Sequence, residues 1–299
     1  MIGEALARRL LAAQFPQWAE LPLTLVDPAG SDHVIYRLGQ ELALRLPRHD
    51  GAIGQARKEA EWLPRLAPRL PLAVPVPMGV GEPAFGYPWP WAVSRWLDGR
   101  VATAEALEDS AETAVRLAEF LTALQSFRTE DFPEDARGGL TAQPLADRDS
   151  ATRAAIAEVE GTFDTTAMTE LWEAALNAPA WEGPPVLFHG DFHTGNLLTR
   201  DGSLSAVIDF GELGMGDPAC DLTIAFTLMS ARSRAVFREA LGVDDATWTR
   251  GRGLALATGL NAYTHYAATH PRVAAQTTRQ ITAALAGTPF SRPAPTPPS

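Results

Sequence analysis

The spacing of hydrophobic positions changes about a third of the way along the chain. Up to residue 98, short apolar runs alternate with turn-forming residues, which predicts strands at 23–27, 33–38, 41–46, 74–80 and 91–96. Short turns join the first three, so we expect an antiparallel meander. An amphipathic helix is predicted at the N-terminus, and another at 54–69, where Pro64 should kink or end its first half.

The remainder of the chain is predicted to be mainly helical. From Thr103 the apolar period is 3.6 residues, which predicts one long helix whose buried face carries Leu107, Ala111, Val115, Ala118, Leu121 and Gln125. Further helices are expected at 150–161, 167–178, 218–229, 232–241, 245–269 and 271–286, and short strands at 186–188 and 204–208. Strands followed by helices predict an α+β fold.

Length and composition favour a two-lobed cytoplasmic protein. The 299 residues suffice for an N-terminal lobe at 1–98 and a helical lobe at 99–286, and the Pro-rich tail 287–299 is predicted to be disordered. The single cysteine, Cys220, excludes a disulfide within the chain; this fits a reducing compartment and would also fit a secreted protein without disulfides. No secretory signal is visible, and the weakly charged stretch 70–93 contains six prolines, so it is not a membrane helix.

The net charge of −11 is unevenly distributed. Residues 1–100 contain 11 basic and 10 acidic side chains, whereas residues 101–299 contain 14 and 26. The acidic region disfavours nucleic acid as a partner, because phosphates require a basic surface. It suits a cationic small-molecule substrate, although an acidic surface that only maintains solubility explains the charge equally well.

Three oxygen-bearing side chains fall in one segment, between residues 186 and 222. The apolar strand at 186–188 is followed by Asp191, Asn196 comes five residues later, and the second apolar strand leads into Asp209. Carboxylate and amide oxygens suit Mg²⁺ that shares the phosphates of a nucleotide. One carboxylate is left to face an attacking hydroxyl, which is sufficient for phosphoryl transfer because catalysis there is mainly positioning and charge neutralisation.

The motifs of this segment resemble those of a known enzyme family. His-Gly-Asp at 189–191, with Asn196 five residues after the aspartate, is similar to the catalytic loop of aminoglycoside phosphotransferases and choline kinases. Ile-Asp-Phe-Gly at 208–211 resembles their metal-binding motif, and Gly-Asp-Pro at 216–218 with Asp221 matches a further block.

The resemblance implies a bilobal, protein-kinase-like fold in which the N-terminal lobe binds ATP or GTP and the helical lobe carries the catalytic loop and the substrate site. Asp191 would be the catalytic base, or would orient the substrate hydroxyl. His189 would brace the loop by hydrogen bonding, and Asn196 and Asp209 would hold Mg²⁺.

Two aspartates of the third block have a structural interpretation. Asp217 directly precedes Pro218, which is the arrangement of a helix N-cap followed by proline in the first turn. Asp221 is expected to anchor the same helix.

By the same resemblance, the third strand carries the cation that binds phosphate. Three leucines of strand 41–46 alternate toward the core, so Ala43 and Arg45 share the opposite face. Ala43 would pack on adenine, and Arg45 takes the place of the usual lysine, which is a departure from the family pattern. Glu59 in the next helix is the expected partner of Arg45, in preference to Glu61 on helical phase.

Other parts of the nucleotide site are expected from their place in the lobe. Lys58 cannot easily replace the missing lysine because it lies in the helix. No glycine-rich loop is present, and Ser31 lies where a phosphate-covering loop would offer backbone donors. Trp96 and Leu97 would form the hinge that binds the adenine edge.

Several alternatives stay open at this point. His189 and His193 have the spacing of zinc ligands on a helix, but glycines disfavour a helix there and no third ligand stands out. The lack of a glycine-rich loop disfavours a protein kinase. The departure at Arg45 would suit a catalytically silent nucleotide-binding protein, whereas the retained Asp191 argues against one.

The motifs do not identify the acceptor. The acidic region favours an aminoglycoside-like cationic antibiotic, and with it a role in antibiotic resistance, while macrolides, choline, homoserine and other metabolites are the alternatives. Neither nucleic acid nor a membrane is expected as a partner. A monomer and a homodimer are both compatible with the sequence.

Overall fold

The computed structural model describes residues 2–26, 32–128 and 144–286, so Ser31 and the tail at 287–299 lie outside it. The chain divides into two units. Among the described residues, unit 1 contains those up to Ala102 together with Asn196–Leu213. Unit 2 contains those from Thr103 to Gly195 together with those from Gly214 onward.

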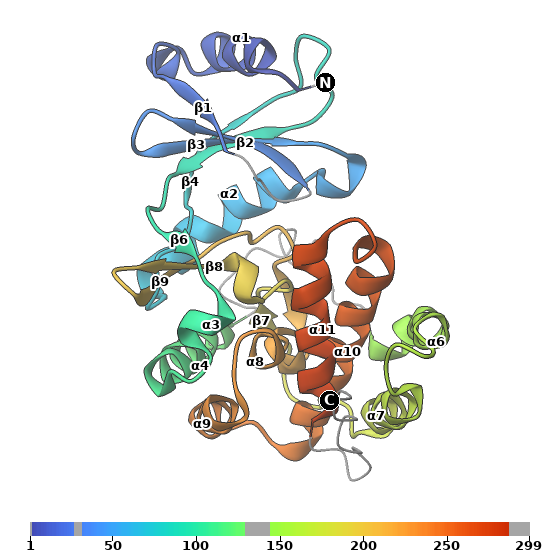
Figure 1. Ribbon diagram of the computed structural model, residues 1–299. Coiled ribbons are helices and arrows are strands. Elements are labelled where there is room, and N and C mark those ends of the chain that lie inside the picture. Colours follow the sequence, from blue (N-terminus) through green and yellow to red (C-terminus); the bar gives the residue numbers. More distant parts are fainter. Residues whose placement is uncertain (1, 27–31, 129–143, 287–299) are drawn as a thin grey trace. The chain divides into compact units, whose positions relative to one another are not determined.

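Unit 1 is built on a five-stranded antiparallel sheet (Figure 1). Each predicted strand is present, and the first three form the expected meander. The strand order is β1-β2-β3-β5-β4. The bounds are Leu23–Leu25 for β1, His33–Leu38 for β2, Leu42–Pro47 for β3, Pro77–Gly81 for β4 and Trp91–Arg95 for β5.

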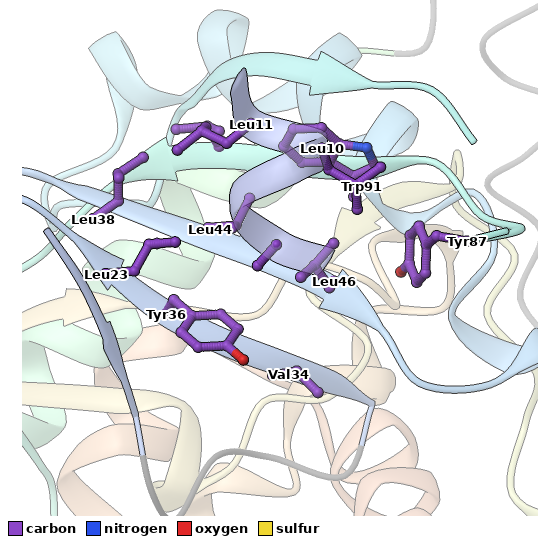
Figure 2. Packing of buried hydrophobic residues seen from close by; sticks show 12 residues of the cluster. Leu10, Leu11, Leu23, Val34, Tyr36, Leu38, Leu44, Leu46, Tyr87 and Trp91 are labelled. Carbon is purple, nitrogen blue, oxygen red and sulfur yellow. The ribbon is translucent and has the colours of Figure 1, made fainter. Parts of the chain in front are cut away.

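One helix lies on each face of this sheet. Leu10 and Leu11 of α1 (Glu4–Gln14) pack into a core with alternate residues of the strands, including Leu44 and Trp91 (Figure 2). Because side chains alternate along a strand, the residues between those core positions face the opposite side. On that side, Glu59 of α2 (Gln55–Leu66) pairs with Arg45 of β3.

The helix predicted at 54–69 is present as α2 and a 3₁₀ turn, Ala67–Arg69, that follows it directly. Pro64 lies inside α2, and the α-helix ends two residues later at Leu66. Because proline has no N–H, Pro64 cannot make the helical hydrogen bond to the carbonyl of the preceding turn, which fits an end of the α-helix close to it.

A second, three-stranded sheet completes unit 1. Its order is β6-β8-β9, with bounds Arg100–Val101, Leu197–Arg200 and Ser203–Val207. Only the last was predicted, because two- and four-residue strands show no clear periodicity. Asp201 and Gly202 connect β8 to β9 with φ of +53° and +80°, as a tight hairpin turn with the Asp-Gly sequence requires.

Unit 2 is mainly helical, with a small two-stranded sheet in which β7 pairs with β10. The helix α10 packs against α7 and α11. A Cβ on Gly253 of α10 would lie 2.3 Å from the Cβ of Ala175 in α7, so this contact requires glycine. The elements are α3 Ala104–Leu107, α4 Ala111–Gln125, α6 Asp149–Glu158, α7 Thr165–Asn177, β7 Val186–Phe188, β10 Gly214–Gly216, α8 Ile224–Thr227, α9 Ala231–Leu241, α10 Asp245–Tyr266 and α11 Pro271–Leu285.

The prediction of one long helix after Thr103 is wrong. The chain forms α3 and then α4, because the hydroxyl of Ser110 accepts the backbone N–H of Thr113 and caps a new helix. The new start rotates the buried face, so Ala111 is exposed whereas Ala114 is buried.

The predicted helix at 218–229 is also wrong. Asp217 does cap Pro218 as expected, by accepting the N–H of Ala219 at 2.9 Å, but the turn is 3₁₀ (Pro218–Asp221) and only the short α8 follows it. The carboxylate of Asp221 is used elsewhere, as shown below. Among the described helices, none combines the length and apolar character needed to span a membrane.

Candidate active site

In unit 1, an arginine on β3 lies between two carboxylates from different elements. Arg45 donates from Nη1 to Oε2 of Glu59 in α2 at 2.5 Å, and from Nη2 to Oδ1 of Asp209 at 3.1 Å. The Glu59 side chain is 1 % exposed, and that of Asp209 is 40 % exposed. Burial alone would lower the pKa of Arg45, but the two carboxylates outweigh it and raise this pKa, so the guanidinium stays charged.

The predicted metal-binding residues Asn196 and Asp209 lie at one end of the β8–β9 hairpin. Leu197 pairs with Val207 in the ladder, and the N–H of Ile208 donates to the carbonyl oxygen of Asn196 at 2.9 Å. Asn196 therefore directly precedes β8 at the end where the chain leaves β9 toward Asp209. The sequence placed the oxygen ligands after the strands at 186–188 and 204–208; in unit 1, Asn196 and Asp209 lie together because β9 pairs with β8, a strand that was not predicted.

The backbone of Asp209 adopts a left-handed conformation, with φ of +65°. This conformation is uncommon for residues other than glycine, although aspartate tolerates it better than most. Asp209, which has this conformation, follows the β8–β9 hairpin, and its carboxylate contacts Arg45.

The segment after Asp209 is held by α2 in a way that was not predicted. Lys58 donates from Nζ to the carbonyl oxygen of Gly211 at 2.9 Å and to that of Leu213 at 3.3 Å. Gln55 of the same helix packs so closely that a Cβ on Gly211 would lie 2.5 Å from its Cδ. Lys58 thus serves the backbone of this segment and does not replace the lysine that is missing from β3.

The remaining predicted nucleotide-binding residues of unit 1 lie on β3 and just after β5. Ala43 is buried, shares a strand face with Arg45 and pairs with Ser94. Trp96 is half-buried, and its indole N–H donates to Oδ1 of Asp98 at 2.9 Å. Leu97 is half-buried as well.

In unit 2, the loop after β7 is anchored by a buried carboxylate. Asp221 accepts the N–H of His189 at 2.7 Å and that of Gly190 at 2.9 Å. The pKa of Asp221 is raised to about 7, because burial and the charge of Asp191 raise it by more than the two N–H groups lower it, and burial is the largest cause. Asp221 therefore binds the loop, a role that the sequence alone did not indicate.

The carboxylate of Asp191 lies beside a histidine of the same loop. Nε2 of His193 is 3.4 Å from Oδ2 of Asp191, whose side chain is 50 % exposed. Nδ1 of His193 accepts the N–H of Gly195 at 3.0 Å and lies 3.3 Å from the amide nitrogen of Gln276 in α11. When Nδ1 accepts, the proton of neutral His193 is on Nε2 and points toward Asp191.

His189 is fully buried at the end of β7, where its Nδ1 accepts the backbone N–H of Asp191 at 3.2 Å. Its ring also lies against that of Phe192, with a centroid separation of 5.5 Å. These contacts hold the loop from inside, while the Asp191 side chain remains accessible to solvent.

The donor set fits Mg²⁺ better than it fits zinc. Among the described residues, no group of three or more His, Cys, Asp or Glu side chains could hold a metal ion. Asn196 and Asp209 instead offer one amide and one carboxylate oxygen, which suits a hard cation that takes its other ligands from water and nucleotide phosphates.

Comparison with known families gives a match over most of the chain. The model described as the phosphotransferase enzyme family matches residues 24–254, which include every motif described above. The chain belongs to this family. It is therefore a small-molecule phosphotransferase, which uses a nucleotide and acts on an alcohol group. None of the curated proteins compared matches this phosphotransferase.

Solved structures with the same fold include enzymes for two classes of antibiotic. The GDP and kanamycin complex of APH(2")-IIia is 19 % identical, covers 93 % of this chain and 97 % of its own, and has a TM-score of 0.74. The streptomycin–ATP complex of APH(2")-IIa is 16 % identical, with coverages of 95 % and 99 % and a TM-score of 0.63. The macrolide 2'-phosphotransferase MphH from Brachybacterium faecium is 25 % identical, with coverages of 97 % and 100 % and a TM-score of 0.62.

These comparisons confirm the fold class and the family that the motifs indicated. The phosphotransferase has an antiparallel N-terminal sheet with a main helix, followed by a mainly helical region. In unit 1, the predicted residues Arg45, Glu59 and Asp209 lie in direct contact. The observed contacts of Lys58 and Asp221 were not predicted, because each side chain binds the backbone of a segment that is distant in the sequence.

Proposed function

We propose that this phosphotransferase moves the γ-phosphoryl group of ATP or GTP to a hydroxyl group of an aminoglycoside-like cationic antibiotic. The observation that carries the proposal is the family match, within which Asp191, Asn196 and Asp209 occur in the order and spacing of the catalytic and metal-binding motifs. The relatives in complex with GDP and kanamycin, or with ATP and streptomycin, support the choice of nucleotide and acceptor. The acidic charge of residues 101–299 suits an acceptor with several ammonium groups.

Each site residue has a role in this proposal. The oxygen of the substrate hydroxyl bonds to the γ-phosphorus, and the nucleoside diphosphate leaves. Asp191 accepts the proton of the hydroxyl in this step. His193 keeps the carboxylate of Asp191 oriented, and His189 braces the loop. Asn196 and Asp209 would hold Mg²⁺, which supplies charge neutralisation at the phosphates when it is bound.

The nucleotide would be bound by residues of unit 1. Arg45 donates to the phosphates, and Glu59 keeps its guanidinium in place. Ala43 packs against the base, and the segment of Trp96 and Leu97 binds the base edge.

A macrolide is the second candidate acceptor. MphH has the highest sequence identity of the three relatives described above. In addition, residues 246–299 contain no acidic side chain, and Gln276 within this stretch lies beside His193. A weakly charged acceptor would therefore meet no carboxylate from α11, whereas an aminoglycoside would need its carboxylates from other elements.

The acceptor can be tested with the purified chain, ATP or GTP, and a panel of aminoglycosides, macrolides, choline and homoserine. Phosphorylated products, detected as a mass increase of one phosphate group, are expected for the aminoglycosides. Products only with macrolides would establish the second candidate. Nucleotide binding without any product would instead indicate a catalytically silent protein.

The role of Asp191 is tested by Asp191→Ala. We expect turnover to fall by about 100-fold or more while the Kd for nucleotide changes little, because the base is lost and the nucleotide-binding residues are intact. Asp147→Ala, at an exposed aspartate of unit 2, is the matched control and should retain full turnover. Near-normal turnover of Asp191→Ala would reject the assignment of the base.

A further inference from the structure

The chain contains a single lysine, Lys58, and its ammonium group is committed to the backbone of the Asp209 segment. The two carbonyl oxygens that it contacts belong to Gly211 and Leu213, which follow Asp209 by two and four residues. An ammonium group has three donors, so one Lys58 side chain can bind both carbonyls at once. These are charge-assisted hydrogen bonds, which are stronger than neutral ones.

The position of Lys58 in its helix is electrostatically unfavourable. Lys58 is the fourth residue of α2, and its N–H donates to the carbonyl of Gly54 at the helix start. The N-terminal turn of a helix carries partial positive charge, which favours acidic side chains over basic ones. The carbonyl oxygens of Gly211 and Leu213 compensate for this, so the lysine is explained by what it binds and not by helix stability.

The neighbouring residues of α2 act on the same segment. Glu59 holds Arg45, whose second nitrogen contacts Asp209. Gln55 is buried and packs against Gly211. Two residues from successive turns of α2 therefore support Asp209. Glu59 does so through Arg45, which contacts the carboxylate of Asp209, and Gln55 does so by packing against Gly211.

We infer that Lys58 is a positioning residue for the metal-binding carboxylate of Asp209. By tying the carbonyls of Gly211 and Leu213 to α2, it keeps Asp209 in its left-handed conformation, with the carboxylate beside Arg45. Without this tie, Asp209 can relax to the commoner right-handed or extended conformations, which redirect its carboxylate. The inference rests on the proposed role of Asp209 in holding Mg²⁺.

The test compares nucleotide affinity with and without the metal. The Kd of a non-hydrolysable ATP or GTP analogue is measured in Mg²⁺ and in EDTA for the full chain, and the ratio gives the enhancement by the metal. In Lys58→Met we expect this enhancement to fall by about tenfold, as for other residues that orient a metal ligand, while the Kd in EDTA stays within about twofold. Lys58→Arg, which retains charged donors, should restore most of the enhancement.

Arg57→Met is the matched control, because it removes a positive charge from the next residue of the same helix. Arg57 pairs only at the surface, with Glu82 at 2.6 Å and both side chains at least 60 % exposed. Its enhancement by Mg²⁺ should equal that of the wild type. An unchanged enhancement in Lys58→Met, or an equal loss in Arg57→Met, would overturn the inference.

Asp209→Asn separates this inference from the proposed function. If Asp209→Asn abolishes the enhancement and Lys58→Met does not alter it, only the role of Lys58 is wrong. If neither variant alters the enhancement, the metal-binding role of Asp209 is wrong as well.

A measurement on the wild-type chain does not depend on the folding of variants. Since Lys58 carries the sole side-chain amine, acetylation with an amine reagent, followed by peptide mass spectrometry, reports on this one group. Coupling between sites is reciprocal, so metal held by Asp209 should in turn stabilise the bonds of Lys58. We expect nucleotide with Mg²⁺ to slow acetylation at least about threefold relative to nucleotide with EDTA; equal rates would contradict the inference.

Discussion

Arg45 shows how a single residue on β3 connects three elements of unit 1. A guanidinium has five donors in a planar fork, so it can bind Glu59 through one nitrogen and Asp209 through the other. A lysine ammonium is a compact point charge and lacks this planar fork. The arginine at this position is therefore matched to two carboxylates, and its charge balances a Glu59 side chain that has almost no access to water.

We expect Arg45→Met to lower the free energy of unfolding by about 3–5 kcal/mol, because Glu59 would be left buried without its partner and would either stay charged or take up a proton, both of which cost free energy. Asp209 adds less to this loss, since its side chain is 40 % exposed and water can solvate it. The measurement is urea unfolding of Arg45→Met, Glu59→Gln and the double variant. The double variant should regain part of the lost stability, and strictly additive losses would contradict a direct coupling.

At the scale of elements, the loop after β7 is positioned by the 3₁₀ turn Pro218–Asp221. Asp221 receives two backbone N–H groups from the first residues of that loop. Asp191 directly follows the anchored residues His189 and Gly190, and His193 lies beside its carboxylate. The orientation of the catalytic candidate thus depends on a turn that lies 32 residues away from His189 in the sequence.

This anchor predicts a pH dependence of stability. The pKa of Asp221 is about 7 in the folded chain, above its ordinary value of 3.8, mainly because of burial. A group with a raised pKa stabilises the fold below its unfolded pKa and loses that contribution as the pH rises through the folded pKa. The stability of the wild type relative to Asp221→Asn should therefore be greatest near pH 4 and should fall by a few kcal/mol, on the order expected from such a shift, by pH 7.

The measurement is urea unfolding of both proteins between pH 4 and pH 8. Asp221→Asn is nearly isosteric but cannot ionise. The NH₂ of its side-chain amide would face one of the two backbone N–H groups that Asp221 binds, so the variant should also lose turnover. A difference in stability that does not vary with pH would show that Asp221 does not titrate in this range.

At the scale of the whole molecule, the distribution of charge is the feature that bears on the acceptor. The net charge of −11 is the sum of +1 for residues 1–100 and −12 for residues 101–299, so all of the excess negative charge lies after residue 100. An acidic surface attracts a polycation through forces that salt screens over about 8–10 Å at ordinary ionic strength. A weakly charged acceptor would gain little from the same field.

We therefore expect the KM for an aminoglycoside to rise several-fold, about threefold or more, when NaCl is increased from 50 to 300 mM. The control is a macrolide, whose KM should change less than about twofold over the same range of NaCl. Equal salt dependence for both acceptors would show that the acidic charge only maintains solubility.

The elements that were predicted correctly depend on residues that are close in sequence. Alternating leucines define β3, and the strand at 186–188 was recovered with its bounds. The errors occurred where a side chain overrides periodicity. Ser110 caps a new helix, although the apolar pattern continues across it. Residues 218–221 form a 3₁₀ turn, which takes the place of the first part of the helix expected there.

The candidate site shows the same division. Local motifs and their resemblance to a known family indicated Asp191, Asn196 and Asp209. The same resemblance implied the pairing of Arg45 with Glu59, and helical phase favoured Glu59 over Glu61. The contact of Arg45 with Asp209 joins residues 164 positions apart, and periodicity carries no information about such a pair.

The amino-acid sequence by itself determined the family, its phosphotransferase chemistry, and a strand-rich N-terminal part followed by a mainly helical one, because these depend on residue type and on spacing over a few positions. Tertiary structure alone decided the supports of the site: Lys58 on the carbonyl of Gly211, 153 residues away, and Asp221 on the loop that carries Asp191. Every residue has a backbone C=O, and every residue except proline has a backbone N–H, so nothing in the sequence marks which of these groups a distant side chain will bind until the chain path brings the two together.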